Sequence, residues 1–179
     1  MDHTGTVLVF QNTTLFNKYL VATPDFSKVL VWSDWSTTRI YDTATLSELH
    51  SEPPGNIPIP GVTQKIAISQ DSTLAIIETS SYNPIKVLNL TDYTVAYSVP
   101  ITGTIFSAHF LDSSNTMIVV FEQSSTYIVN LTSGAQYSIP LITATDYTTD
   151  MSNNIFTCHN NVIEQLQVTF GSPIIPAST

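Results

Sequence analysis

The residue types that most often bind metals or act as nucleophiles are few in this chain, and their spacing does not match known sites. The four histidines form neither a His-x-His nor a His-Glu-x-x-His pattern. Cys158 and His159 are neighbours in a predicted strand, so their side chains point to opposite faces, which argues against a thiolate–imidazole pair. We therefore expect no metal site and no cofactor. The histidines, expected to be packed or surface residues, are His3, His50, His109 and His159.

Other catalytic patterns are equally weak. No serine stands in a Gly-x-Ser-x-Gly elbow, and no glycine-rich phosphate loop is present. Asp34, Glu78 and Glu122 could approach one another at one face of the fold as a carboxylate pair, but solvated loop acids are the more ordinary interpretation. We predict that the protein is not an enzyme.

A second kind of chemistry, recognition, is suggested by the predicted loops that join second to third strands. Two of these loops carry an aromatic side chain, Trp35 or Tyr82, flanked by small polar groups, and aromatic residues concentrate binding energy. The alternative is that Trp35 and Tyr82 only cover the end of the core. The residues of this predicted interaction face are Asp34, Trp35, Tyr82, Asn83, Glu122, Gln123, His159 and Asn160.

Three Asn-x-Thr sequons, at Asn12, Asn89 and Asn130, are candidate N-glycosylation sites. Their number is no more than chance placement would give in a chain so rich in serine and threonine. Asn89 and Asn130 also fall in equivalent predicted turns, where asparagine is favoured because its side chain bonds its own backbone two residues onward.

The elements that must position these residues repeat along the chain. Asp25, Asp71, Asp112 and Asp150 each lead a turn between two apolar strands, with separations of 46, 41 and 38 residues. Each copy continues with a polar loop, a third strand and a polar turn. A strand-based period of about 40 residues is typical of propeller blades. Such a unit cannot bury its apolar face alone and must stack on its neighbours.

Within each copy the apolar residues recur with a period close to two, which predicts a four-stranded antiparallel meander. The apolar runs Lys28–Trp32 and Met117–Phe121 predict second strands buried on both faces. We divide a repeat domain over 1–170 into blades at roughly 17–53, 62–100, 103–140 and 142–170. Residues 5–16 are assigned to a flanking blade, and 171–179 form a Pro/Ser/Thr-rich tail.

Composition favours an all-β fold and excludes some partners. Of the 179 residues, 42% are apolar and only 11% are charged, with few strong helix formers among them. The formal net charge of −9 leaves no basic stripe, so we expect no nucleic-acid binding. We find no apolar run long enough to span a bilayer and expect no membrane insertion. The single cysteine allows no internal disulfide.

The repeats resemble WD-repeat and YVTN-type β-propellers. The first turn of that superfamily is often Ser-Pro-Asp-Gly-Lys, and Thr23-Pro24-Asp25-Phe26-Ser27-Lys28 is similar to it. The third strand often ends in an apolar-Asp-x-x-Thr-Gly pattern, which Tyr41–Thr45 and Val129–Gly134 resemble. No Trp-Asp or Gly-His pair is present, and the glycine of the first turn is missing throughout. The resemblance implies about four blades, as a four-bladed ring, a partial propeller or one completed by other chains.

We therefore expect a non-catalytic protein-interaction or structural module of a larger assembly, with contacts through blade edges and the loop face, including self-association. Low charge, abundant serine and threonine and the tail favour a secreted or cell-surface location, with glycans as further partners. The alternatives are a cytoplasmic WD-repeat-like scaffold subunit and a carbohydrate-binding or hydrolytic propeller.

Overall fold

The computed structural model describes residues 18–33, 38–52, 66–77, 85–101, 105–123, 125–139, 146–159 and 162–169. Within these ranges the secondary structure is entirely β, which confirms the predicted all-β class. No helix in these ranges is long and apolar enough to cross a membrane. In chain order the strands are β1 (Lys18–Ala22), β2 (Lys28–Ser33), β3 (Thr38–Asp42), β4 (Glu48–Glu52), β5 (Ile66–Ile68), β6 (Leu74–Ile77), β7 (Ile85–Asn89), β8 (Val95–Val99), β9 (Ile105–Phe110), β10 (Met117–Glu122), β11 (Thr126–Asn130), β12 (Gln136–Ile139), β13 (Asp146–Thr149), β14 (Asn154–His159) and β15 (Val162–Gln167).

The strands form four antiparallel meanders. The first sheet has the order β1-β2-β3-β4, the second β5-β6-β7-β8, and the third β9-β10-β11-β12. The fourth sheet has three strands among the described residues, in the order β13-β14-β15. The pairing register is equivalent from sheet to sheet: Leu30 lies opposite Ile40 in the first sheet, and Ile76 lies opposite Val87 in the second.

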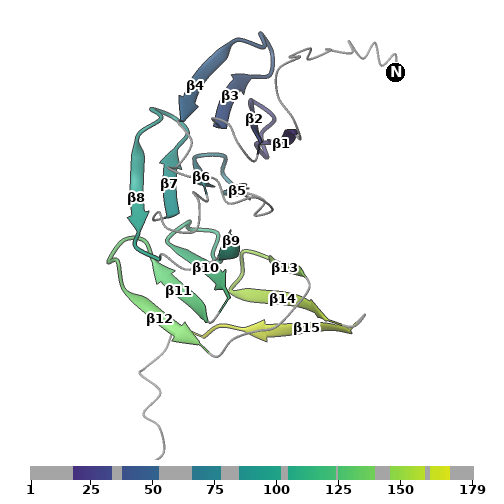
Figure 1. Cartoon of the computed structure of the whole chain (residues 1–179), viewed down its shortest axis with the longest axis vertical. Coiled ribbons are helices and arrows are strands. Elements are labelled where there is room, and N and C mark those ends of the chain that lie inside the picture. The colour runs from purple at the N-terminus through teal and green to yellow at the C-terminus, as the bar shows by residue number, and fades with distance from the viewer. Residues whose placement is uncertain are drawn as a thin grey trace, which may run out of the picture.

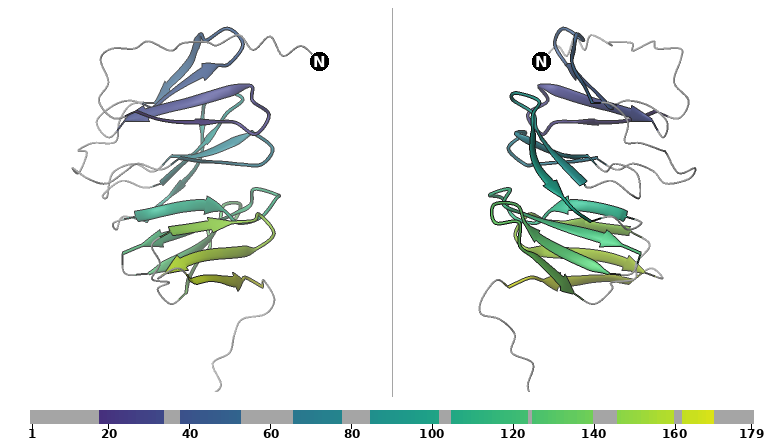
Figure 2. Two further views of the ribbon diagram at one scale, coloured as in Figure 1. Left: turned by 90° about the vertical axis from the view of Figure 1, so that its right-hand side faces the viewer. Right: turned by 60° about the vertical axis from the view of Figure 1, so that its left-hand side comes forward.

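The sheets stack face to face along an arc. Figure 1 shows β1, β5, β9 and β13 on the inner side of this arc and β4, β8 and β12 on its outer side. Figure 2 shows the four sheets one above another when the molecule is turned. The inner strands of neighbouring sheets contact one another, β5 against β9 and β9 against β13. The arrangement is the radial one that the repeats predicted.

The core is divided into three layers, one between each pair of neighbouring sheets. Because side chains alternate along a strand, each sheet turns one set to the next sheet, here named its forward face, and the other set to the preceding sheet, its backward face. The layer between the first two sheets joins Leu30 and Ile40 to Ala75, Ile77 and Leu88. The other two layers are built in the same way. Burying each of these leucine and isoleucine side chains contributes about 1.5–3 kcal/mol, so stacking supplies the main stabilisation.

The two apolar runs expected to be buried on both faces differ. In β10, Ile118 and Val120 point to the second sheet, Val119 and Phe121 point to the fourth, and all four are buried. For Lys28–Trp32 the prediction was wrong: Leu30 and Trp32 are buried, whereas Val29 and Val31 are only half-buried. The reason is that no sheet of the described residues covers the backward face of the first sheet.

Candidate protein-binding surface

One end of the stack is made by the Asp-led turns, whose carboxylates bind their own backbone. Asp25 accepts hydrogen bonds from the Thr23 hydroxyl (2.6 Å), the Ser27 amide (3.0 Å) and the Ser27 hydroxyl (2.9 Å). These bonds, that from Thr23 first, hold the pKa of Asp25 well below its usual range. Burial works against the charged form of Asp71, but bonds from Ser69, Thr73 and Asn115 together lower its pKa. Each carboxylate therefore stabilises its own turn.

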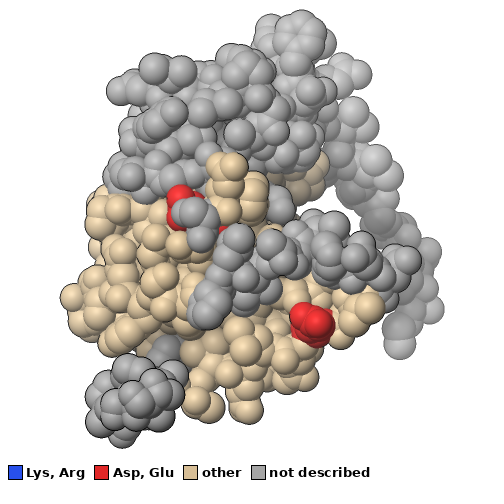
Figure 3. All heavy atoms as spheres, turned by 60° about the horizontal axis from the view of Figure 1, so that its bottom comes forward, with Lys and Arg blue, Asp and Glu red and all other residues tan. Residues whose placement is uncertain are grey.

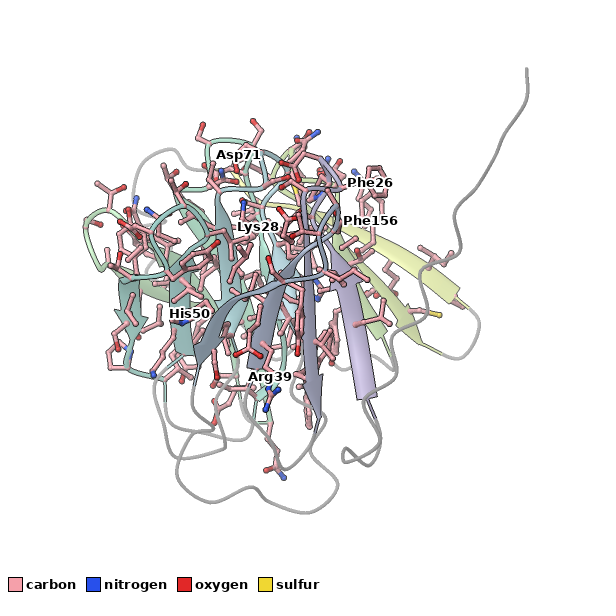
Figure 4. The ribbon with its side chains drawn as sticks, turned by 90° about the horizontal axis from the view of Figure 1, so that it is seen from above. Phe26, Lys28, Arg39, His50, Asp71 and Phe156 are labelled. Carbon is pink, nitrogen blue, oxygen red and sulfur yellow. The ribbon has the colours of Figure 1, made fainter. Side chains whose placement is uncertain are left out.

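The same turns join neighbouring sheets. The Asp25 amide donates to the Ser72 hydroxyl of the second sheet at 3.0 Å. Asn115 of the third sheet bonds the Asp71 carboxylate, and the Asn153 amide donates to the Leu111 carbonyl at 2.9 Å. Figure 4 shows Asp71 and Phe26 at this end and Arg39 towards the other. We conclude that the Asp-led end is an internally bonded, structural end of the stack.

The predicted interaction face belongs to the opposite end, where second strands finish. Glu122 ends β10, its amide donates to the Ser125 carbonyl at 2.9 Å, and Gln123 is exposed. His159 ends β14, as predicted. Asp34, Trp35, Glu78, Tyr82, Asn83 and Asn160 lie outside the described residues. The interaction face and the carboxylate pair therefore stay predictions.

Two of the three sequon asparagines have a visible structural role. Asn89 and Asn130 end β7 and β11, and their side-chain oxygens accept the amides of Thr91 (2.8 Å) and Ser133 (2.9 Å). Asp42 does the same at the end of β3. This shared turn explains asparagine at both positions without a sugar. Asn12 lies outside the described residues, and glycosylation stays a prediction.

Two of the predicted packed histidines make ring contacts. His109, in the first strand of the third sheet, meets Phe121 edge-on with ring centroids 6.3 Å apart. His50 stacks on Tyr93 of the second sheet at 5.1 Å and an interplanar angle of 7°. Within the described ranges no three His, Cys, Asp or Glu residues are grouped so that they could hold a metal ion.

The most distinctive surface of the described residues is one that sequence reasoning missed, the outer strand and forward face of the fourth sheet. Strand β15 is exposed along its whole length, and its apolar side chains Val162, Ile163 and Leu166 are 56%, 74% and 42% exposed. The corresponding third strands of the other sheets consist entirely of buried and half-buried residues. Figure 3 brings this lower end of the molecule forward, and its described surface is almost wholly uncharged apart from small acidic spots.

Strand β15 also has a free hydrogen-bonding edge among the described residues, because β14 pairs with only one side of it. An edge strand presents unpaired amides and carbonyls that can bind another strand. Together, the exposed edge and the exposed apolar side chains define what we name the β15 surface, comprising Val162–Gln167. Its chemistry suits another protein chain.

No protein-family model matches the sequence, and no curated protein sequence matches it. Among solved structures, the chain is similar to the Cps50 (Swd1) β-propeller domain of Myceliophteria thermophila, with a TM-score of 0.61 and 8% identity over 77% of this chain and 49% of that one. It is similar to the WD40 repeats of RRP9, with a TM-score of 0.60 and 17% identity over 77% and 43% of the two chains. It is also similar to a hydrazine synthase of Kuenenia stuttgartiensis, with a TM-score of 0.57 and 9% identity over 83% and 45%.

These likenesses confirm the β-propeller fold expected from the repeats. The chain spans about half the length of each of these structures. Its described sheets therefore correspond to about half of a propeller ring.

Proposed function

We propose that the protein is a non-catalytic interaction module that binds another protein chain through the β15 surface. The partner's strand would pair with the free edge of β15, and its apolar side chains would cover Val162, Ile163 and Leu166. Main-chain hydrogen bonds supply affinity in this mode of recognition, and side-chain pockets supply specificity.

The observation that carries the proposal is the exposure of β15. Large apolar side chains on a monomer's surface are ordinary when scattered singly, but a contiguous group marks an interaction site. Here Val162 and Leu166 share one face of a six-residue strand, and Ile163 lies on its other face along the same edge. Only one acidic residue, Glu164, and no basic residue interrupts it, so the strand lacks the lysines that usually protect an edge.

The experiment compares two matched substitutions. Leu166→Lys places a charge on the β15 edge, and Leu49→Lys places one on β4, the outer strand of the complete first sheet. The two leucines are 42% and 38% exposed, so both variants should fold. Proteins that co-purify with the tagged wild-type chain from its native source should be retained by Leu49→Lys and lost by Leu166→Lys.

Hydrogen exchange supplies a second readout on the purified complex. The amides of β15 should become protected when the partner is bound, because they gain acceptors on the added strand. If Leu166→Lys retains every partner and β15 amides exchange equally fast with and without them, the proposed surface is wrong.

We further propose that the assembly is extracellular or on the cell surface. Support comes from the low charge and the abundant serine and threonine, and the turns of Asn89 and Asn130 present their threonines at the surface. Mass spectrometry of native material tests this location: sugar on Asn89 or Asn130 is expected, and both asparagines unmodified would move the protein to the cytoplasmic alternative.

A further inference from the structure

We propose that a second copy of this chain completes the ring, with the forward face of the fourth sheet of each copy packed on the backward face of the first sheet of the other. This inference goes beyond the proposed function, because it names a second contact, separate from the β15 edge, and the partner that makes it. It starts from the two ends of the stack, where one face of the first sheet and one of the fourth have no further sheet against them among the described residues.

The forward face of the fourth sheet carries Phe156, Ile163 and Gln165. Ile155 and Tyr147 pack on the third sheet, so the neighbouring Phe156 points the other way. Gln165 lies opposite Phe156, and Ile163 lies opposite Cys158, two residues further along β14. Ile163 is 74% exposed.

The equivalent positions inside the stack are closed. By register and turn position, Phe156 corresponds to Ile76 of the second sheet, and Ile163 to Ile85. Both isoleucines are 0% exposed, because the third sheet covers them. The forward face of the fourth sheet is therefore a stacking face that has kept its apolar residues.

The backward face of the first sheet is the matching surface. It carries Val29 and Val31 of β2, with Leu20 opposite Val31 on β1 and Arg39 opposite Val31 on β3. Tyr41, opposite Val29 on the same face, is only 7% exposed, so the open part of this face is the part around Leu20. Leu20 is 70% exposed. Val29 and Val31 are half-buried, whereas the equivalent residues of the second sheet, Ala75 and Ile77, are 0% and 3% exposed.

The rule of stacking inside the chain decides which face meets which. Every internal layer sets the forward face of one sheet on the backward face of the next, as Leu30 and Ile40 meet Ala75 and Ile77. A second copy obeys the same rule when its first sheet comes after the fourth sheet of the first copy. The chain corresponds to about half of each propeller that it matches, so two copies supply one full turn.

The buried area is sufficient only if both contacts form. The three described strands of the fourth sheet, of about five residues each, present roughly 240 Å² to a neighbour at standard strand spacings. One contact would bury roughly 500 Å² over both partners, which is in the range of weak encounters, whereas two bury roughly 1,000 Å², the least that a biological interface needs. A closed pair with two-fold symmetry is thus favoured over an open chain of copies.

The experiment is sedimentation of the purified full chain over a range of concentrations. The wild type should run at about twice the chain mass of 19.6 kDa. Each contact joins one forward face to one backward face. Leu20→Asp places a charge on both backward faces of the pair and Ile163→Asp on both forward faces, so each variant disrupts both contacts and should be monomeric. Phe26→Asp is the matched control, because Phe26 is also 74% exposed but lies in an Asp-led turn, and it should stay dimeric.

Mixing the two monomeric variants separates this pairing from others. Leu20→Asp keeps an intact forward face and Ile163→Asp an intact backward face, so the mixture should form a heterodimer through one contact, weaker than the wild type. If Leu20→Asp alone remained dimeric, like faces would be pairing and the proposal would be overturned.

A wild-type chain that stays monomeric at all concentrations would also overturn it, and would point to further sheets or a different protein on these faces. That result leaves the proposed function standing if Leu166→Lys still loses its co-purified partners. Loss of no partner together with a monomeric wild type would remove both proposals.

Discussion

The ring stack of Phe121 and Tyr147 offers a direct test of how neighbouring sheets are held together. Phe121, on β10 of the third sheet, is 1% exposed, and Tyr147, on β13 of the fourth, is 8% exposed. Their ring centroids lie 4.0 Å apart with an interplanar angle of 24°. The pair therefore bridges two sheets that share no strand.

The substitution of Phe121 must be small enough for the domain to remain folded. Phe121→Ala would lower the free energy of unfolding by about 3–5 kcal/mol, a large part of the 5–15 kcal/mol typical of a domain. Phe121→Leu keeps most of the apolar volume and loses the ring. We expect it to lower the free energy of unfolding by about 1.5 kcal/mol, from lost packing and lost ring contact.

A double-mutant cycle isolates the contact between the sheets. Phe121→Leu and Tyr147→Leu, measured singly and together by urea unfolding at one protein concentration, should show a coupling of about 1 kcal/mol. Phe121→Leu combined with Phe26→Leu, in the first sheet, should be additive within about 0.5 kcal/mol. A coupling no larger than in that control pair would mean that the third and fourth sheets do not pack as described.

Two further predictions concern the turns. Phe26 is mostly exposed and has a left-handed backbone at φ 57°, and Gly134 has one at φ 72° with open space around an added Cβ. Because only glycine adopts this conformation without strain, Phe26→Gly should raise the free energy of unfolding by about 0.5 kcal/mol, and Gly134→Ala should lower it by about 1 kcal/mol. Urea titrations measure both changes, and the reverse signs would refute the strain argument. The pKa values of Asp25, Asp42 and Asp71 are lowered in the folded chain, so the stability that they contribute is present above the unfolded value of about 4 and is lost as pH falls through the folded values. Thermal unfolding should show a melting temperature that falls between pH 5 and pH 2, more steeply than in Asp25→Asn; a flat profile would contradict this.

The repeated turns were the part of the fold that sequence could predict best. Asp25, Asp71 and Asp112 all accept amides or hydroxyls from residues two to five positions onward, as a local pattern requires. Local chemistry is enough to specify such a turn. The strands between the turns are predicted by alternation, which is also local.

Other features could not be predicted because they depend on residues distant along the chain. Four positions have a left-handed backbone conformation, for which glycine is the usual residue, but carry other residue types, so the sequence did not indicate this conformation. They are Phe26, Leu46, Ser72 and Tyr93. Tyr93 keeps its place through the stack on His50 of the first sheet.

Burial at the ends of the stack was equally hidden. The apolar run of β2 is the same whether or not another sheet precedes it. The sequence pattern therefore could not show that Val29 and Val31 are more exposed than the equivalent Ala75 and Ile77. The exposure of Ile163 and Leu166 depends in the same way on whether a further sheet or strand covers them. Pattern predicts which residues can stack, and only the neighbouring sheet decides which of them do.

This dependence on neighbours is the reason why we place the proposed interactions at the ends of the stack. In a repeat architecture each unit contacts only the units beside it, so stability is close to a sum of interface terms. Three layers stabilise the four described sheets, and the two terminal faces carry apolar residues that no further sheet of the described residues covers. Covering both faces would add two interfaces of a kind that the chain already makes three times. A partner that brings a propeller sheet face would therefore bind by the same kind of packing that joins the sheets inside the chain. Leu20 and Ile163 make the terminal faces apolar, although polar residues there would have little effect on the internal layers.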